Sequence, residues 1–192
     1  VKTLREQAQR CRDILAKIAQ LSSSGAPFDR MPLSTLIEES VAPHRDFGIS
    51  IKLKPGERTG AEPVGRRNPG VIYGLGNLVE NAVDFAHTSV SVSWTWDDAS
   101  VLLTITDDGA GFPAEVIDRI GEPYMSTRQG AEPGGGLGLG LFIAKTLLER
   151  SGASIVFSNS SGPGEGALVQ IKWPRSVFVY ADGVAGTSLN AV

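Results

Sequence analysis

The chain contains 192 residues, of which 41% are hydrophobic and 20% are charged, a composition that allows a buried core and argues against disorder. Basic residues number 18 and acidic residues 21, and the net charge of −3 gives no support to a nucleic-acid-binding face. The apolar runs are shorter than the roughly 18 residues of a membrane helix, so no membrane contact is expected from this chain. The single cysteine, Cys11, excludes an internal disulfide and fits a reducing compartment.

Residues 1–22 follow the pattern of one amphipathic helix. Apolar side chains recur at alternating spacings of four and three residues, as in a coiled-coil seam: Leu4, Ala8, Cys11, Leu15 and Ile18. A helix of this length is marginal alone in water, so the seam requires a partner. That partner is either the rest of its own domain or a second chain in a dimerising helical hairpin. A loop rich in Ser, Gly and Pro is expected at 22–27.

The chain beyond this loop alternates between helical and strand patterns. Helices are predicted over 32–39, 69–86, 115–120 and 137–151. Strands are predicted over 49–53, 90–96, 101–106, 154–157 and 167–173, with the second and third forming a hairpin. The stretches 54–70 and 121–136 are expected to be irregular. Residues 175–192 show only a short apolar run, so both a stray strand and a disordered tail stay open.

One predicted helix carries a polar stripe. Asn77, Glu80, Asn81 and Asp84 are spaced so that they share one face, and the opposite face is apolar: Leu75, Leu78, Val79, Ala82, Phe85 and Ala86. Asparagine is a poor helix former, so two of them on one stripe require a reason. The stripe is either an ordinary solvated face or a set of oxygen ligands for Mg²⁺, which bridges substrate phosphates.

A second polar segment, Asp107-Asp108-Gly109-Ala110-Gly111, directly follows a predicted strand. The two glycines allow a sharp turn or a close approach of the backbone to a flat ligand. A carboxylate at the strand end can accept a hydrogen bond from an exocyclic amine such as adenine N6. The same residues also occur in ordinary turns.

A run of glycines from residue 134 leads into the last predicted helix. Backbone N–H groups at a helix start bind anions and suit a polyphosphate. No Gly-Lys-Ser/Thr follows, which excludes a Walker A loop. No strand directly precedes the glycines, which disfavours a dinucleotide-binding fingerprint.

In this order the segments resemble the catalytic and ATP-binding domain of sensor histidine kinases, whose fold is shared with gyrase-type and chaperone ATPases. The matching segments are an N box at 77–86, a first G box at 107–111, an F-box-like stretch at 122–128, a second G box at 136–141 and a late glycine turn at 162–166. The sequences of the N box and the second G box are similar to those of the redox-responsive RegB/PrrB type. The resemblance implies an α+β fold, a two-layer α/β sandwich of the Bergerat type, with a mostly antiparallel sheet.

The resemblance also implies roles for individual residues. Asn81 would ligate the Mg²⁺ that bridges the ATP phosphates, and Asn77 would line the same site. Asp107 would accept a hydrogen bond from adenine N6, while Gly109 and Gly111 would allow the backbone to wrap around the base. Further ATP-binding residues would lie in the F-box-like stretch and the second G box: Thr127, Arg128, Gly136, Leu137, Gly138, Leu139, Gly140 and Leu141.

Several residues depart from the family pattern or play an open role in it. Glu80 matches the general base of related ATPases, and in a kinase it would help to orient the reacting groups. Asp84 stands where many relatives carry a basic residue, so one phosphate contact is expected to be missing. Neither His44 nor His87 lies in a His-Glu-Leu-type sequence, so the phospho-accepting histidine is expected outside this chain. Cys11 is either a small apolar seam residue or a redox-sensitive thiol between subunits.

The resulting prediction divides the chain into three parts. Residues 1–22 would be the second helix of a truncated dimerisation hairpin, 23–174 the catalytic domain, and 175–192 a tail of unknown role. The domain would bind Mg-ATP and transfer the γ-phosphate to a histidine for relay to a response-regulator receiver domain. A homodimer through the N-terminal helix and a cytoplasmic position in an inner-membrane sensor are implied. The alternatives are an ATP hydrolase or serine-directed kinase of the same fold, or a non-catalytic dimerisation module.

Overall fold

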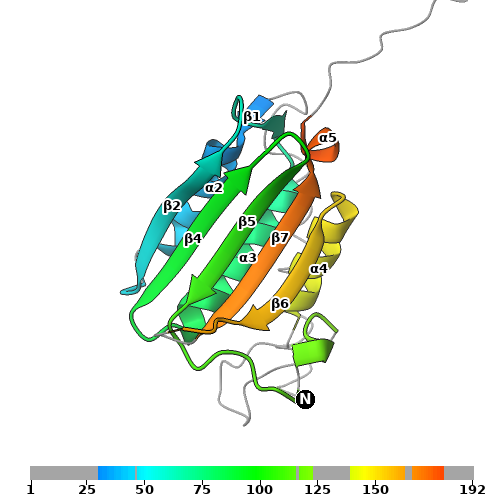
Figure 1. The fold of residues 1–192 in the computed structure, drawn as a ribbon. Helices are drawn as coiled ribbons and strands as arrows, with labels where there is room; N and C mark the ends of the chain where they lie inside the picture. Colours follow the sequence, from blue (N-terminus) through cyan, green and yellow to red (C-terminus); the bar gives the residue numbers. More distant parts are fainter. Residues whose placement is uncertain (1–29, 46, 116, 123–138, 163–165, 180–192) are drawn as a thin grey trace, which may run out of the picture.

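The computed structural model describes residues 30–45, 47–115, 117–122, 139–162 and 166–179. Three helices lie against one face of a five-stranded sheet (Figure 1). The helices of this layer are α2 (Leu33–Val41), α3 (Pro69–Phe85) and α4 (Gly140–Arg150). The strands of the sheet are β2 (Ser50–Arg58), β4 (Ser89–Trp96), β5 (Ser100–Asp107), β6 (Ser154–Asn159) and β7 (Ala167–Pro174). The predicted α+β class and the two-layer α/β sandwich are confirmed.

The sheet has the strand order β2-β4-β5-β7-β6. Strands β2 and β4 run parallel, and the other three pairings are antiparallel. The hairpin between β4 and β5 turns at Asp97, whose Oδ1 accepts from the backbone N–H groups of Ala99 at 2.8 Å and Ser100 at 2.6 Å. The prediction of a mixed, mostly antiparallel sheet with this hairpin is therefore confirmed.

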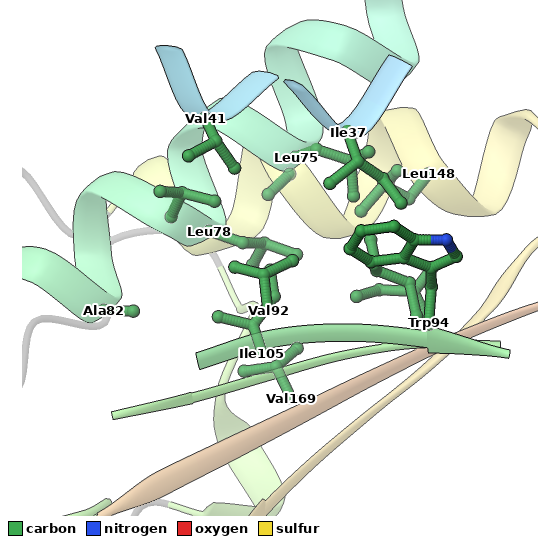
Figure 2. Close-up of a cluster of buried hydrophobic side chains, with 14 of the residues drawn as sticks. Ile37, Val41, Leu75, Leu78, Ala82, Val92, Trp94, Ile105, Leu148 and Val169 are labelled. Atoms are coloured by element: carbon green, nitrogen blue, oxygen red, sulfur yellow. The ribbon is translucent and has the colours of Figure 1, made fainter. Parts of the chain in front are cut away.

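The core lies between the sheet and the three helices. Strands β4, β5 and β7 alternate between buried and partly exposed residues, because successive side chains of a strand point to opposite faces. Val92, Ile105 and Val169 project from neighbouring strands toward the helices (Figure 2). Leu75 and Leu78 of α3 lie above them and are almost fully buried. This shared apolar layer fixes α3 over the middle of the sheet.

Helix α3 begins at Pro69, whose missing N–H costs nothing in a first turn. The Asn68 side chain caps it by accepting from the N–H groups of Gly70 at 2.9 Å and Val71 at 3.3 Å. A Cβ on Gly74 would lie 3.1 Å from Leu148 of α4, so glycine allows the two helices to approach closely.

Helices α3 and α4 run antiparallel. Gly70 of α3 lies next to Leu147 of α4. Gly74, one turn further along α3, lies next to Leu148 and also next to Ala144, which comes earlier in α4. The first residues of α4 therefore lie beside the C-terminal half of α3, which carries the polar stripe.

The stretch 54–70 is more regular than predicted. Strand β2 continues to Arg58, whose guanidinium lies over the Trp96 ring at 5.6 Å from its centroid. Pro55 is tolerated because β2 is an edge strand. A further strand, β3 (Val64–Arg66), pairs antiparallel with β1 (Arg30–Pro32) in a separate two-stranded sheet.

Other differences concern short elements. The helix expected at 115–120 is a single 3₁₀ turn, η2 (Ile117–Arg119), and another 3₁₀ turn, η1 (Ala42–His44), follows α2. The described part of the last long helix begins at Gly140 rather than at residue 137. Phe85, assigned to the apolar face of α3, is 38% exposed because it ends the helix beyond the edge of the core.

The chain after β7 forms a four-residue helix, α5 (Arg175–Phe178), rather than a strand. The Phe178 ring packs edge-on against Trp173, with centroids 5.7 Å apart. A Cβ on Gly65 of β3 would lie 2.9 Å from the Phe178 carbonyl oxygen, so α5 also touches the two-stranded sheet. In the described ranges, no helix has the length and apolarity required to cross a membrane.

Candidate functional site

A buried carboxylate marks one end of the sheet. Asp107 is the last residue of β5 and is 7% exposed. Its Oδ1 accepts from the N–H of Gly109 at 2.9 Å and from the N–H of Ala167 at 3.2 Å. Among the described residues both donors bind Oδ1, so Oδ2 is left to accept from a ligand. Burial raises the pKa of the Asp107 carboxyl above its ordinary value, and the two backbone hydrogen bonds oppose that shift.

Two glycines allow the backbone to close around this carboxylate. A Cβ on Gly109 would lie 2.1 Å from the Phe85 carbonyl oxygen at the end of α3. A Cβ on Gly166 would lie 2.0 Å from the Asp107 carbonyl oxygen. No real Cβ atom is found at such distances, so both positions require glycine. The contact of Gly109 also joins the end of β5 to the end of α3.

The next carboxylate, Asp108, joins the same elements. It accepts from the backbone N–H groups of His87 at 2.9 Å, Thr88 at 2.9 Å and Ser89 at 3.0 Å, and from the Thr88 hydroxyl. The hydrogen bonds from Thr88, above all that from its hydroxyl, hold the pKa of Asp108 well below its ordinary range. Asp108 therefore fixes the connection between α3 and β4 beside the loop that follows Asp107.

We call residues 108–112 the strand-end loop. Gly111 has φ of +75°, a left-handed conformation that favours glycine. Phe112 is buried and packs edge-on against Phe157 of β6, with centroids 6.0 Å apart. The side chain of Asn159, the last residue of β6, binds the Phe112 backbone. The loop is thus held to the sheet from both of its ends.

The polar stripe lies on the second half of α3. Asn81 is half-buried and lies one helical turn before Phe85, whose carbonyl contacts Gly109. Asn77 is also half-buried and donates from Nδ2 to the Tyr73 carbonyl at 2.9 Å, which leaves its Oδ1 as an acceptor. Glu80 and Asp84 are exposed. Carboxylate and amide oxygens are the ligands that Mg²⁺ prefers, so this donor set fits a magnesium ion shared with phosphates.

The N-terminus of α4 lies beside this stripe because α3 and α4 run antiparallel. Its N-cap residue, Leu139, provides no side-chain hydrogen bond, and the first helical backbone bond runs from Ile143 N–H to the Leu139 carbonyl at 2.8 Å. The N–H groups of the first turn, including those of Gly140 and Leu141, therefore have no partner within the helix. Such groups and the helix dipole suit an anionic ligand.

The structure thus brings three predicted segments to one end of the fold. These are the strand-end carboxylate with its glycines, the polar stripe and the start of α4. The other predicted nucleotide contacts lie outside the described residues: Thr127, Arg128, Gly136, Leu137 and Gly138. Cys11 also lies outside them. In the part of the chain that the structure describes, no group of three or more His, Cys, Asp and Glu side chains is placed to hold a metal. An ion held by Asn81 and phosphate oxygens does not require such a group.

Three contributors to this region are absent from the predicted site residues. Asp108 belongs to a predicted turn motif, although an Asp-Asp pair at a strand end is a signal for a second, capping carboxylate. Ala167 contributes only its backbone N–H, which no side-chain pattern reveals. Asn159 lies beyond the predicted end of its strand, so the sequence pattern does not show its register against β7.

Comparisons with known proteins agree with this arrangement. The sequence profile described as "Histidine kinase-, DNA gyrase B-, and HSP90-like ATPase" matches residues 69–177, more than half of the chain. The chain therefore belongs to this ATPase family. The match spans α3, the strand-end loop, α4 and β7, which are the elements that build the candidate site.

Individual relatives show which members of this ATPase family the chain resembles. The sensor histidine kinase RegB of Cereibacter sphaeroides is 42% identical over 190 residues, which cover 89% of this chain and 41% of RegB. The chain thus spans less than half the length of this relative. The predicted resemblance to sensor histidine kinases of the RegB type is confirmed.

Two solved structures share the fold. The mycobacterial sensor histidine kinase MprB has a TM-score of 0.61 at 19% identity, over 77% of this chain and 97% of that one. Full-length ShkA in complex with AMPPNP has a TM-score of 0.64 at 22% identity, over 95% of this chain and 39% of that one. At these identities the likeness shows the fold alone.

Proposed function

We propose that the chain is the Mg-ATP-binding catalytic domain of a sensor histidine kinase. It binds ATP between α3, the strand-end loop and the start of α4, and transfers the γ-phosphate to a histidine that lies outside this chain. The observation that carries the proposal is the buried Asp107 carboxylate, with two backbone donors on one oxygen and the other oxygen available. The family membership and the 42% identity to RegB support the same activity.

The base end of the site follows from the chemistry of Asp107. A carboxylate oxygen accepts hydrogen bonds and repels other acceptors, so it favours a ligand edge with an amino group, such as adenine N6. Gly109 and Gly111 allow the loop backbone to lie directly against Phe85 and Asn159, which keeps the loop close to Asp107 and to the base that it would bind. The deep position of the carboxylate excludes water and strengthens that hydrogen bond.

The phosphate end follows from α3 and α4. Asn81, with Asn77 one turn earlier, would hold the magnesium ion, and the N–H groups at the start of α4, which have no partner within the helix, would bind phosphate oxygens. The metal would supply neutralisation of the phosphate charge. Phosphoryl transfer depends mainly on positioning and charge, so these residues bind and orient the γ-phosphate for attack by an imidazole. Glu80, at the solvent edge of the stripe, would help to orient the reacting groups.

Neither histidine of the chain fits the role of acceptor. His44 lies in the 3₁₀ turn after α2, tilted against Phe47, and its Nε2 lies close to Gly76 of α3. His87 follows the end of α3, and its backbone is held by Asp108. Neither lies on a helix face that a second domain could align with the γ-phosphate. We therefore place the acceptor histidine outside this chain.

The wider role is part of the same proposal. The phosphoryl group would pass from that histidine to an aspartate of a response-regulator receiver domain. Residues 1–22 would form a homodimer through their apolar seam, and the complete protein would be anchored in the inner membrane with this domain in the cytoplasm. RegB, the relative with 42% identity, is a sensor histidine kinase by name.

The binding step is tested by calorimetric titration with ATP and Mg²⁺. The unchanged chain is expected to bind one ATP, and Asn81→Ala is expected to weaken binding at least about tenfold through loss of a metal ligand. Val156→Ala, an exposed change on β6, serves as the matched control. No ATP binding by the unchanged chain, or equal affinity in Asn81→Ala, would contradict the proposal.

The transfer step is tested with ATP labelled in the γ-phosphate. The chain alone is expected to bind the nucleotide without gaining label on His44 or His87. Label that is lost in His44→Ala or His87→Ala would contradict an external acceptor. Steady release of inorganic phosphate that Glu80→Ala abolishes would favour a hydrolase instead.

A further inference from the structure

The strand-end loop is bound by two residues that face each other across a pair of strands. Asn159 is the last residue of the edge strand β6, and its register partner on β7 is Ala167. The Ala167 N–H binds Asp107, the residue directly before the loop, at 3.2 Å. Asn159 binds Phe112, the last residue of the loop. One cross-strand pair therefore fixes both ends of the segment that carries Gly109 and Gly111.

The contact of Asn159 is bidentate. Its Oδ1 accepts from the Phe112 N–H at 2.7 Å, and its Nδ2 donates to the Phe112 carbonyl at 2.8 Å. The side-chain amide of Asn159 thus binds both the N–H and the carbonyl of Phe112, as the backbone of a neighbouring strand would. The amide carries a donor and an acceptor side by side, so the orientation of the side chain is set by its partner.

The position of Gly111 depends on the same side chain. A Cβ on Gly111 would lie 2.7 Å from Asn159 Oδ1, so the loop backbone lies directly against the amide. Asn159 itself is exposed at the sheet edge and contributes little to the apolar core. Its two hydrogen bonds therefore act mainly on where the loop lies, and less on whether the domain folds.

We propose that Asn159 is a positioning residue for nucleotide recognition, which holds the strand-end loop at the distance from Asp107 that an adenine ring requires. The inference rests on the proposed function, because it assigns the loop to the base. It adds a residue on β6, outside the segments that the sequence assigned to ATP. Without the bidentate contact, the backbone of Gly111 and Phe112 is held only through the packing of the Phe112 ring on Phe157, while Asp107 stays fixed by Ala167. The loop then loses its fit to the base.

The test compares Asn159→Ala and Asn159→Asp with the unchanged chain. Asn159→Asp keeps the size and one acceptor, but it places a second acceptor oxygen opposite the Phe112 carbonyl. Ser154→Ala is the matched control, because it removes a side-chain contact to the Lys172 carbonyl at the other end of β6. Affinities for Mg-ATP and Mg-GTP are measured by calorimetry at a temperature at which every variant is folded, and urea unfolding gives each stability.

Both Asn159 variants are expected to raise the Kd for ATP at least about fivefold, since each loses one or two hydrogen bonds. The preference for ATP over GTP is expected to fall, because a displaced loop discriminates less between an amino and a keto edge. Ser154→Ala is expected to keep both values of the unchanged chain. A merely structural contact would lower the unfolding free energy and leave the ATP affinity and the preference of the folded protein unchanged.

The outcomes separate this inference from the proposed function. If the unchanged chain binds ATP and both Asn159 variants bind it equally well with the same preference, the inference is overturned and the proposed function stands. If affinity falls only in proportion to the folded fraction, the inference is also overturned. If the unchanged chain binds no ATP, both are overturned.

Discussion

Asp107 places a carboxyl group in a buried position, where burial raises its pKa. A protonated or neutral group would avoid the desolvation that raises its pKa, and the same two backbone N–H groups would still find an acceptor. A buried carboxyl group with a raised pKa, one oxygen of which accepts no hydrogen bond from the described residues, is typical of binding groups.

The first prediction concerns the effect of the Asp107 carboxylate on stability and on ATP affinity. Asp107→Asn keeps an oxygen for Gly109 and Ala167 but presents an amide N–H where the ligand expects an acceptor. We expect the thermal midpoint of the nucleotide-free chain to stay equal or rise. The Kd for ATP should rise about ten- to a hundredfold, since a hydrogen bond to a charged group is worth about 1.5–3 kcal/mol. Calorimetry and thermal unfolding check both values, and a strong loss of stability without a loss of affinity would contradict the assignment.

The second prediction concerns Asp108 and pH. Its pKa is lowered in the folded chain by the hydrogen bonds from Thr88 and its neighbours, so its stabilisation is present above the unfolded pKa, near 3.8, and is lost as pH falls below it. Asp108→Asn should therefore lower the unfolding free energy at pH 7, and the difference from the unchanged chain should shrink as the pH falls below about 4. Urea denaturation across this range measures it.

The control for this prediction is Asp98→Asn, an exposed carboxylate in the turn between β4 and β5. It is expected to show no comparable difference at pH 7. A difference for Asp108→Asn that stays constant down to pH 3 would show that its carboxylate is not the stabilising group.

At the scale of single elements, α3 carries most of the proposed metal site and depends on its cap. Asn68→Ala removes the acceptor for two backbone N–H groups and should lower the unfolding free energy by about 1 kcal/mol. That corresponds to a fall in the thermal midpoint of about 2–4 °C for a domain of this size. Asn68→Ser, which keeps a capping oxygen, should lose less, and equal losses in the two variants would contradict the capping role.

The elements that the sequence predicted well are those with a repeating pattern. Helix α3 and the strands β4, β5 and β7 bury one face, so their spacing of apolar residues follows the helical or strand period. Strand β3 and helix α5 span only three and four residues, too few to show a period. They form because of partners distant in sequence, namely β1 for β3 and Gly65 of β3 for α5, where Gly65 lies against Phe178.

The candidate site was predictable in its side chains and not in its supports. The sequence proposes Asp107 and Asn81 because their residue types are chemically unusual at a strand end and on a helix face. The contact of Ala167 with Asp107, 60 positions away, depends on the register of β7 against β5. The contact of Asn159 with Phe112, 47 positions away, depends on the place of β6 beside β7. Such pairings are set by the folded sheet and leave no local signal in the sequence.

For the molecule as a whole, the site joins three elements that are distant in sequence. A ligand that bridges α3, the strand-end loop and the start of α4 binds only the folded state and should stabilise it. At a hundredfold excess of Mg-ATP over Kd, the gain should be about 2.7 kcal/mol, or roughly 5–10 °C in the thermal midpoint. Removal of Mg²⁺ with a chelator should abolish most of this shift in the thermal midpoint. In Asn81→Ala the shift should be small and should depend little on Mg²⁺.

The most direct measurement is a crystal structure of the chain with Mg²⁺ and a non-hydrolysable ATP analogue. Our account predicts the adenine amino group within hydrogen-bond distance of Asp107 Oδ2, and the metal bound to Asn81 and the phosphates. It also predicts that Asn159 still binds the Phe112 backbone. A nucleotide bound elsewhere, for example beside Trp173 and Phe178 at α5, would contradict it.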